Sequence, residues 1–243
     1  MVFSGVMVEL GLYGLARVYW IVFSGTVPAA TIHRALFTLG ALTALVGALM
    51  CWRQRHLKRL LAFSTLAHMG LFLIAIGAAS GPGVAGAAVY VAAHAGAKAA
   101  LFACVGILLD RLGSVDELDL YGRGRQLPLT DVLFAVGGPA LAGLPPFGVG
   151  LGKALAETAA GESGAPWAPA LFVLVSAVTG AAVLRAGLRV FAGAGPRPSD
   201  RKEADRTAGD DSDPDTGRPL PRTPATMLAT PLILLLGTLA VGT

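Results

Sequence analysis

The chain has 243 residues, of which 54% are hydrophobic and only 14% are charged, and its mean hydropathy is +0.67. A soluble domain carries about a quarter charged residues, so this composition excludes an ordinary soluble protein and indicates an integral membrane protein. The net charge is +4, but no stretch joins clustered basic residues to exposed aromatic residues, which argues against a nucleic-acid partner.

Apolar segments recur along the chain, and a helix needs about 20 such residues to cross the hydrocarbon core. Leu, Ala, Val and Gly dominate them without the alternation of β-barrel strands, and Pro or Gly residues separate them. We therefore expect an all-α, polytopic transmembrane helix bundle with broken helices. The about eight expected spans are 2–25, 33–52, 60–79, 83–109, 129–143, 146–160, 167–191 and 225–242.

The fifth and sixth spans are short and meet at a Gly-Leu-Pro-Pro-Phe-Gly sequence at 143–148. Prolines remove backbone donors, and lipid tolerates a helix interruption only where protein or a wet cavity surrounds it. The sequence therefore predicts either a tight turn between two short spans or an interruption beside an ion site. Lys153, one to two turns beyond the break, favours the ion site.

Basic residues cluster at 53–59, at 111–125 and after 185. If 129–160 is one broken span, all three clusters lie on one side of the membrane, as the positive-inside rule expects. If it is two spans, the last cluster lies opposite the first two. Residues 193–223 hold 13 of the 34 charged residues and several prolines, so we expect a disordered aqueous loop there.

Ionisable residues lie within or beside several of the apolar spans. A charge at mid-bilayer costs at least about 2.5–3.5 kcal/mol on insertion scales, so such residues are rare and usually serve transport. Burial favours the neutral form of lysine, and histidine titrates near neutrality, so both release protons readily. The candidates for a proton pathway are Glu9, Lys58, His68, His94, Lys98, Lys153 and Glu157.

Two candidate pairs are spaced four residues apart and therefore share a helical face. His94 and Lys98 lie among small residues that admit water, which favours a relay step over a polar pair that fastens two helices. Lys153 and Glu157 form either a structural ion pair or a pair that a passing proton switches. The position of Lys58 at the start of an apolar span is typical of a cation that reaches the membrane–water interface. The alternative is that Lys58 belongs to the proton pathway.

Two further polar sets allow similar alternatives. Glu9 shares a helical face with Tyr13 and Arg17. These three residues form either part of an ion pathway or a polar seam between helices. Ser64 and His68, one turn apart, either extend a hydrated track or hydrogen-bond between helices. Cys51 and Cys104 match no metal or redox spacing, and we find no nucleophile–base pair, haem motif or dinucleotide loop. We expect no catalytic residue, cofactor or metal on this chain.

Four segments across residues 4–157 resemble, in order, motifs of one family. They are SGVMVELGLYGLARVYW, LKRLLAFSTLAHMGLFLIAIG, HAGAKAALFACVGILLDR and LAGLPPFGVGLGKALAE. The family comprises the antiporter-like, proton-pumping subunits of respiratory complex I and of Mrp-type multisubunit cation/proton antiporters. The resemblance implies that Lys58, His94, Lys98 and Lys153 lie on the polar axis that relays protons. Glu9 falls where most members have lysine, although a carboxylate also exchanges protons.

The resemblance covers the carboxy-terminal half of a fourteen-helix subunit, so the first six helices have no counterpart here, as in a fragment, a misassigned start or a split gene. It implies that 129–143 and 146–160 span separately and that 193–223 faces the cytoplasm. We expect a transmembrane proton-translocation domain over 1–192, the disordered hydrophilic loop over 193–223, and a final transmembrane helix over 224–243.

The predicted function is a proton- or cation-translocating subunit of a Mrp-type antiporter or related complex in the bacterial inner (plasma) membrane. Its expected partners are other membrane subunits, the lipid bilayer, protons and Na+. One alternative is an antiporter-like subunit of NADH-quinone oxidoreductase or of a membrane-bound hydrogenase. Another is a truncated structural or assembly subunit without its own ion path. A quinone-reducing enzyme is disfavoured, because no cofactor motif is found.

Overall fold

The computed structural model describes residues 7–23, 25–196 and 223–243. Within these residues the regular structure is helical, with one isolated antiparallel β-bridge, which confirms the all-α prediction. The α-helices are α1 (Val8–Val18), α2 (Ala29–Arg53), α3 (Leu57–Gly77), α4 (Gly81–Leu112), α5 (Pro128–Ala142), α6 (Gly148–Glu162), α7 (Ala168–Gly187) and α9 (Ala225–Gly242). Short π or 3-10 segments are η2 (Tyr19–Phe23), η3 (Arg123–Gln126) and η4 (Leu188–Ala192).

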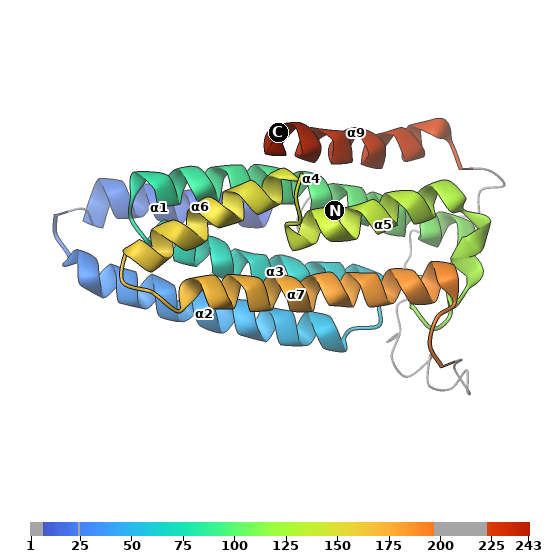
Figure 1. Ribbon diagram of the computed structural model, residues 1–243, viewed down its shortest axis with the longest axis horizontal. Helices are drawn as coiled ribbons and strands as arrows, with labels where there is room; N and C mark the ends of the chain where they lie inside the picture. The colour runs from blue at the N-terminus through green and yellow to red at the C-terminus, as the bar shows by residue number, and fades with distance from the viewer. Residues whose placement is uncertain (1–6, 24, 197–222) are drawn as a thin grey trace.

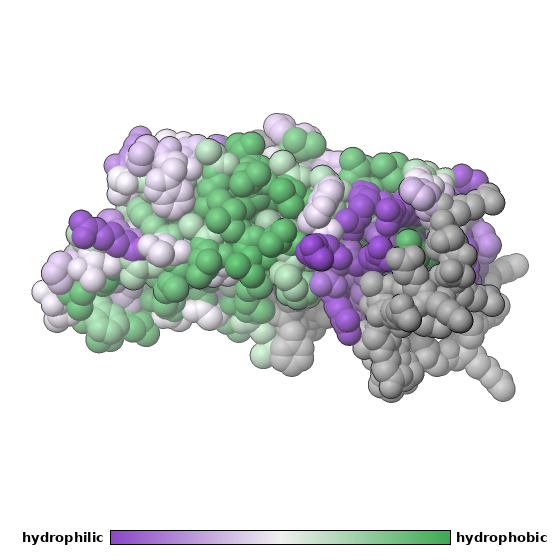
Figure 2. All heavy atoms as spheres, turned by 90° about the horizontal axis from the view of Figure 1, so that it is seen from below, coloured by the Kyte–Doolittle hydropathy of each residue, from purple (hydrophilic) through white to green (hydrophobic). Residues whose placement is uncertain are grey.

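Five of the described helices are long and apolar enough to cross a membrane: α2, α3, α4, α7 with η4, and α9. They run along the long axis of the bundle (Figure 1). In Figure 2, apolar residues cover the middle of the visible face, and hydrophilic residues gather towards its ends. This banded surface and the helix lengths identify a membrane protein.

Local sequence signals set the helix ends. Ser80 precedes α4 and its hydroxyl accepts a hydrogen bond from the Gly83 amide at 3.2 Å, as an N-cap does. Gly113, with a φ of 73°, ends the same helix in the left-handed conformation that glycine adopts without strain. At the start of α3, His56 Nδ1 accepts from the Arg59 amide at 3.4 Å.

Helices α5 and α6 follow one another along the bundle (Figure 1). Gly137 of α5 faces Leu101 in the second half of α4, whereas Gly152 of α6 packs against Tyr90 in its first half. Each has 15 residues, or about 22 Å, which is too short alone for a hydrocarbon core of about 30 Å. They form one interrupted crossing, so the expectation of two separate spans was wrong: Gly143 and the prolines end α5 at mid-bundle.

This single crossing brings the three basic clusters to one end of the molecule. Arg185, near the end of α7, donates to the carbonyl oxygens of Trp52 at 2.5 Å and Gln54 at 2.6 Å. Arg189 pairs with Glu117, in the segment after α4, at 2.7 Å. The α2–α3 turn, the α4–α5 connection and the end of α7 therefore meet, and we name this region the basic end.

Small residues allow the helices to approach closely. A Cβ atom added at Gly70 of α3 would clash with the backbone of Ala44 on α2, so these two backbones are in contact. Such small-residue interfaces are typical of membrane helices. The predicted hydrophilic loop at 193–223 lies, apart from 193–196 and 223, outside the described residues, and α9 is the helix predicted after it.

Candidate functional site

Polar and ionisable side chains from five helices gather inside the apolar bundle. Burying such groups is costly unless they are hydrogen-bonded, so their partners indicate what they do. We name this set the buried polar track. Its members are Glu9 of α1, Ser64 and His68 of α3, Tyr90, His94 and Lys98 of α4, Lys153 of α6, and Ser176 and Thr179 of α7.

Lys153, which is 9% exposed, reaches back across the break between α5 and α6. Its Nζ donates to the carbonyl oxygen of Ala142 at 3.3 Å and to Ser176 Oγ at 2.5 Å. Ala142 is the last residue of α5, where carbonyl groups lack helical partners and carry the negative end of the helix dipole. The break therefore creates a binding position for an ammonium group in the bundle interior.

Two hydroxyl groups on α7, which share no direct hydrogen bond among the described contacts, lie between Lys153 and a histidine on α3. Ser176 and Thr179 are three residues apart on α7, and Thr179 Oγ1 lies 3.3 Å from the Ser176 carbonyl oxygen. The same hydroxyl lies 3.4 Å from His68 Nε2. His68 Nδ1 is 2.6 Å from the Tyr90 hydroxyl, so both ring nitrogens of this fully buried histidine have partners.

The track continues from His68 to His94 and Glu9. The centroids of the two imidazole rings are 4.8 Å apart, at an angle of 32°. His94 Nδ1 lies 3.1 Å from Glu9 Oε1, and the Glu9 side chain is only 8% exposed. His94 Nε2 is buried without a hydrogen-bond partner among the described residues. Buried polar atoms are normally satisfied, so this nitrogen marks a place for a water molecule or a proton.

Lys98 lies one turn beyond His94 on the same face of α4. Its Nζ donates to the Leu61 carbonyl oxygen at 2.7 Å and to the Ser64 hydroxyl. Ser64 Oγ in turn donates to the Leu61 carbonyl at 2.9 Å. The hydrogen-bond partners of this fully buried lysine in the described part of the chain are therefore neutral.

The structure thus brings five predicted site residues together: Glu9, His68, His94, Lys98 and Lys153. Four of them come from α3, α4 and α6, and Glu9 comes from α1. The carbonyl group of Ala142 at the end of α5 holds Lys153 in place.

Lys58 and Glu157 lie outside this track. Lys58 is half-buried in the first turn of α3 and lines a cavity beside Gly106 and Thr230, between α4 and α9. Glu157 is half-buried one turn beyond Lys153. No ion pair within 4.0 Å joins Glu157 to Lys153 among the described residues, because the Lys153 amine is directed to α5 and α7 instead.

Tyr13 and Arg17 do not continue inward from Glu9. Tyr13 is 62% exposed, and the Arg17 guanidinium lies 5.9 Å from the Tyr13 ring centroid on the outside of α1. The expected seam of three residues on one face of α1 is therefore limited to Glu9.

Sequence reasoning missed Tyr90, Ser176 and Thr179. The available signal for the two hydroxyls was a Ser and a Thr spaced three apart in α7, which is apolar apart from these residues and Arg185 in its last turn. It also missed Glu117, which is fully buried at the basic end between Arg189, at 2.7 Å, and Arg185, at 3.6 Å. Burial raises the pKa of the Glu117 carboxyl group, and the nearby arginines offset this effect only in part.

Comparisons with known proteins identify the wider group. A family described as NADH:quinone oxidoreductase/Mrp antiporter, transmembrane, matches residues 1–179. The chain is 36% identical over 147 residues to NAD(P)H-quinone oxidoreductase chain 4 of Synechococcus sp., covering 60% of this chain and 27% of that protein. It is 33% identical over 177 residues to NADH-quinone oxidoreductase subunit N of Geotalea uraniireducens, covering 73% and 38%.

Among solved structures, one chain of the Mrp complex from Dietzia sp. matches with a TM-score of 0.80 at 26% identity. That match covers 99% of this chain and 49% of the Mrp chain. The present chain therefore spans about half, or less, of the length of the proteins it matches.

Proposed function

Because this chain belongs to the NADH:quinone oxidoreductase/Mrp antiporter transmembrane family, as its motifs predicted, we propose that it relays protons through the membrane as a subunit of a cation/proton antiporter or related complex. The observation that carries the proposal is the buried polar track. It places two hydroxyls and two adjacent imidazoles between the ammonium group of Lys153 and the carboxyl group of Glu9, which supports the proposal.

Hydroxyls and imidazoles both donate and accept, which suits them to proton transfer between the terminal ammonium and carboxyl groups. A proton released by Lys153 passes to the Ser176 hydroxyl and then through one bridging water to Thr179 and His68 Nε2, since no direct hydrogen bond joins the two hydroxyls among the described contacts. His68 Nδ1 passes it to the Tyr90 hydroxyl at 2.6 Å, and a second bridging water carries it to His94 Nε2, which has no hydrogen-bond partner among the described residues. Glu9 accepts the proton from His94 Nδ1 at 3.1 Å. Moving one charge across about 100 mV involves about 2.3 kcal/mol, so modest differences between sites suffice to set the direction.

The charge of Lys98 regulates how strongly His94 holds a proton. It lies four residues after His94, on the same helical face, so two positive charges there repel each other. When Lys98 is protonated, a proton arriving at His94 is driven on towards Glu9. When Lys98 is neutral, His94 holds the proton more readily. This coupling gives the relay two states without any movement of a helix.

We place the basic end at the cytoplasm of a bacterial inner (plasma) membrane. The positive-inside rule assigns the more basic side to the cytoplasm, and the opposite end of the described chain carries few basic residues. The partners we propose are further membrane subunits, as in the Mrp complex, and the transported ions are protons, exchanged for Na+. A role in a quinone oxidoreductase or a hydrogenase uses the same track.

The test uses the membrane complex that contains this chain, purified through a tag on the chain and reconstituted into vesicles. Lys153→Ala and Lys98→Ala each remove one ammonium group, and we expect proton transport to fall at least about tenfold. Thr158→Ala, on the exposed face of α6, serves as the matched control. Unchanged transport in both lysine variants would refute the relay and favour a purely structural subunit. Subunits that co-purify identify the type of complex.

A further inference from the structure

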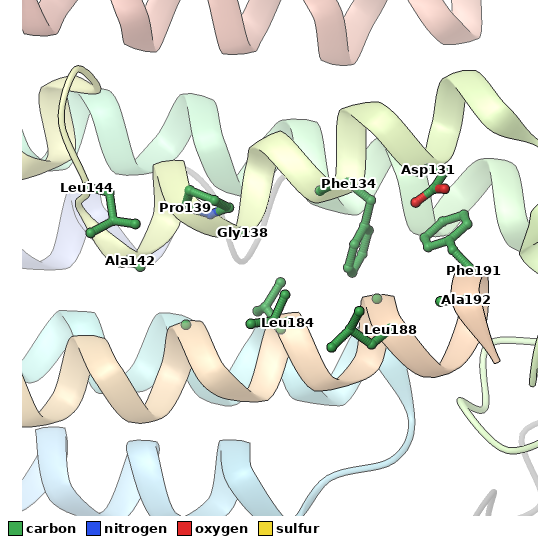
Figure 3. Close-up of a pocket in the computed structure, with 14 residues that line it drawn as sticks. Asp131, Phe134, Gly138, Pro139, Ala142, Leu144, Leu184, Leu188, Phe191 and Ala192 are labelled. Atoms are coloured by element: carbon green, nitrogen blue, oxygen red, sulfur yellow. The ribbon is translucent and has the colours of Figure 1, made fainter. Parts of the chain in front are cut away.

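An apolar groove runs between α5 and α7 on the outside of the bundle, and the proton relay does not use it (Figure 3). Its cavity volume is about 260 Å³. Small residues open the groove: Ala135, Gly138 and Ala142 on α5, and Gly180 and Gly187 on α7. Leu144, Leu184 and Leu188 form exposed edges, so the groove is open on the outer surface of the described bundle.

The length and position of the groove suit one acyl chain. Its lining extends from Asp131 to Ala142, eleven positions and therefore about 16 Å along α5. One leaflet contributes about half of a hydrocarbon core of about 30 Å. The groove begins at the basic end, where Asp131, Phe191 and Ala192 lie together (Figure 3). It therefore spans one leaflet from the membrane surface inwards.

The mouth of the groove carries both signs of charge. The Asp131 carboxylate lines the groove and forms no ion pair with another described residue. Arg125 is exposed, and its guanidinium donates to the carbonyl oxygen of Ala192, a lining residue at the same end. An acid and a base at one mouth complement a headgroup that combines an ammonium with a phosphate. An anionic headgroup without an amine would meet the Asp131 carboxylate unfavourably.

We propose that this groove binds one phospholipid with a zwitterionic headgroup that combines an ammonium with a phosphate, with an acyl chain between α5 and α7. Surrounding lipid is as apolar as the groove, so headgroup and shape, rather than hydrophobicity, select the occupant. The inner end of the groove is formed by Ala142 and Gly180, and the Ala142 carbonyl accepts from Lys153. A bound acyl chain therefore keeps water that enters along the groove away from the Lys153 ammonium group.

The test places the purified, lipid-depleted membrane complex that contains this chain in nanodiscs of an equal mixture of phosphatidylethanolamine and phosphatidylglycerol, so that the two lipids compete. One sample contains a trace of the ethanolamine lipid, and the other a trace of the glycerol lipid, with a photoreactive diazirine on its acyl chain. We expect labelling of peptides from 134–142 and 180–192 to be about two- to fivefold stronger with the ethanolamine lipid, as expected for a partly exposed charge contact. Labelling is independent of proton transport, so it does not depend on the proposed function.

Variants separate the groove from the rest of the surface. Ala135→Phe fills the groove and should remove the selective labelling, whereas Val132→Phe, on an exposed part of α5 outside the groove, should leave it unchanged. Asp131→Asn should abolish the preference between the two lipids, and the exposed Asp119→Asn should preserve it. Equal labelling by both lipids, labelling unaffected by Ala135→Phe, or a partner helix found cross-linked in the groove would overturn the proposal.

Discussion

The imidazole rings of His68 and His94 face each other in the centre of the bundle, with centroids 4.8 Å apart at 32°. One ring belongs to α3 and the other to α4. Each ring also contacts a side chain of another helix. His68 Nε2 lies near the Thr179 hydroxyl of α7, and His94 Nδ1 lies near the Glu9 carboxyl group of α1. Phe72 packs edge-on against His94, with centroids 5.3 Å apart, and fixes the orientation of the ring. The two histidines are thus the junction between the two halves of the buried polar track.

Replacing Thr179 tests the α7 link. Thr179→Val keeps the shape of the side chain but removes the hydroxyl that lies 3.4 Å from His68 Nε2. We expect proton transport by the reconstituted complex to fall about tenfold, because losing one hydrogen-bonded step adds about 1.4 kcal/mol to the barrier. Thr230→Val removes an exposed hydroxyl bonded to the backbone of its own helix and should have no effect. Equal transport in the two variants would exclude Thr179 from the route.

Substitutions of Glu9 test whether its carboxyl group accepts the proton from His94. Glu9→Gln keeps the hydrogen bond to His94 but cannot take up a proton, so we expect transport to be lost while assembly is retained. Glu9→Lys introduces the residue common in the resembling family, but it places a second cation beside His94. Transport should be lower in Glu9→Lys than in wild type. Wild-type transport in Glu9→Gln would show that the proton leaves His94 by another route.

The close approach of α4 and α6 predicts a stability difference between two glycines on α6. A Cβ at Gly152 would clash with the Tyr90 backbone, so Gly152→Ala should destabilise the protein by about 1–3 kcal/mol. Gly161 has open space around its Cβ position, so Gly161→Ala should be neutral or stabilising by up to about 1 kcal/mol. Thermal unfolding in detergent measures both. Equal melting temperatures would contradict the packing of α6 against Tyr90.

Glu117 predicts a pH dependence of stability at the basic end. Burial raises the pKa of this carboxyl group in the folded protein above its ordinary value of 4.5. Its contribution to stability is therefore fully present below pH 4.5 and is lost as the pH rises through the folded-state pKa. Glu117→Gln cannot ionise, so the melting temperature of wild type relative to this variant should fall as the pH rises from 4.5 through the folded-state pKa.

Asp119→Asn provides the matched control for that experiment, because Asp119 is half-exposed in the same connection. Its melting curve should follow that of wild type at every pH. If wild type instead gained stability over Glu117→Gln as the pH rose, the ion pairs with Arg185 and Arg189 would outweigh the burial of the carboxyl group.

Much of the fold follows from the sequence because span length and Pro/Gly punctuation are local properties. Each expected span corresponds to a described helix, including the two short ones on either side of the break. The arrangement of those two short helices relative to each other does not follow from the local sequence. Whether 129–143 and 146–160 lie side by side or end to end depends on which part of α4 each contacts. Contacts such as Gly152 with Tyr90 decide this, and no sequence pattern reports them.

The candidate site shows the same division. Ionisable residues at bilayer depth are conspicuous in the sequence, so Lys98, His94 and Lys153 were predicted. Hydroxyl residues such as Thr179 are common in membrane helices, where they usually bond to the backbone one turn earlier, so spacing alone does not reveal a contact across helices. The Lys153–Glu157 pair was suggested by spacing of four residues, but the break offers the lysine a carbonyl partner that spacing cannot indicate.

The central claim is that the buried ionisable groups form one connected route for protons, rather than separate fastenings between helices. A cryo-EM structure of the assembled complex that resolves ordered waters tests this most directly. We expect a water bridging the Tyr90 hydroxyl, which contacts His68, and His94 Nε2, with hydrogen-bonded continuity from Lys153 to Glu9. A dry contact between the two rings, with each polar group satisfied only by its own neighbouring helix and no water at His94 Nε2, would contradict it.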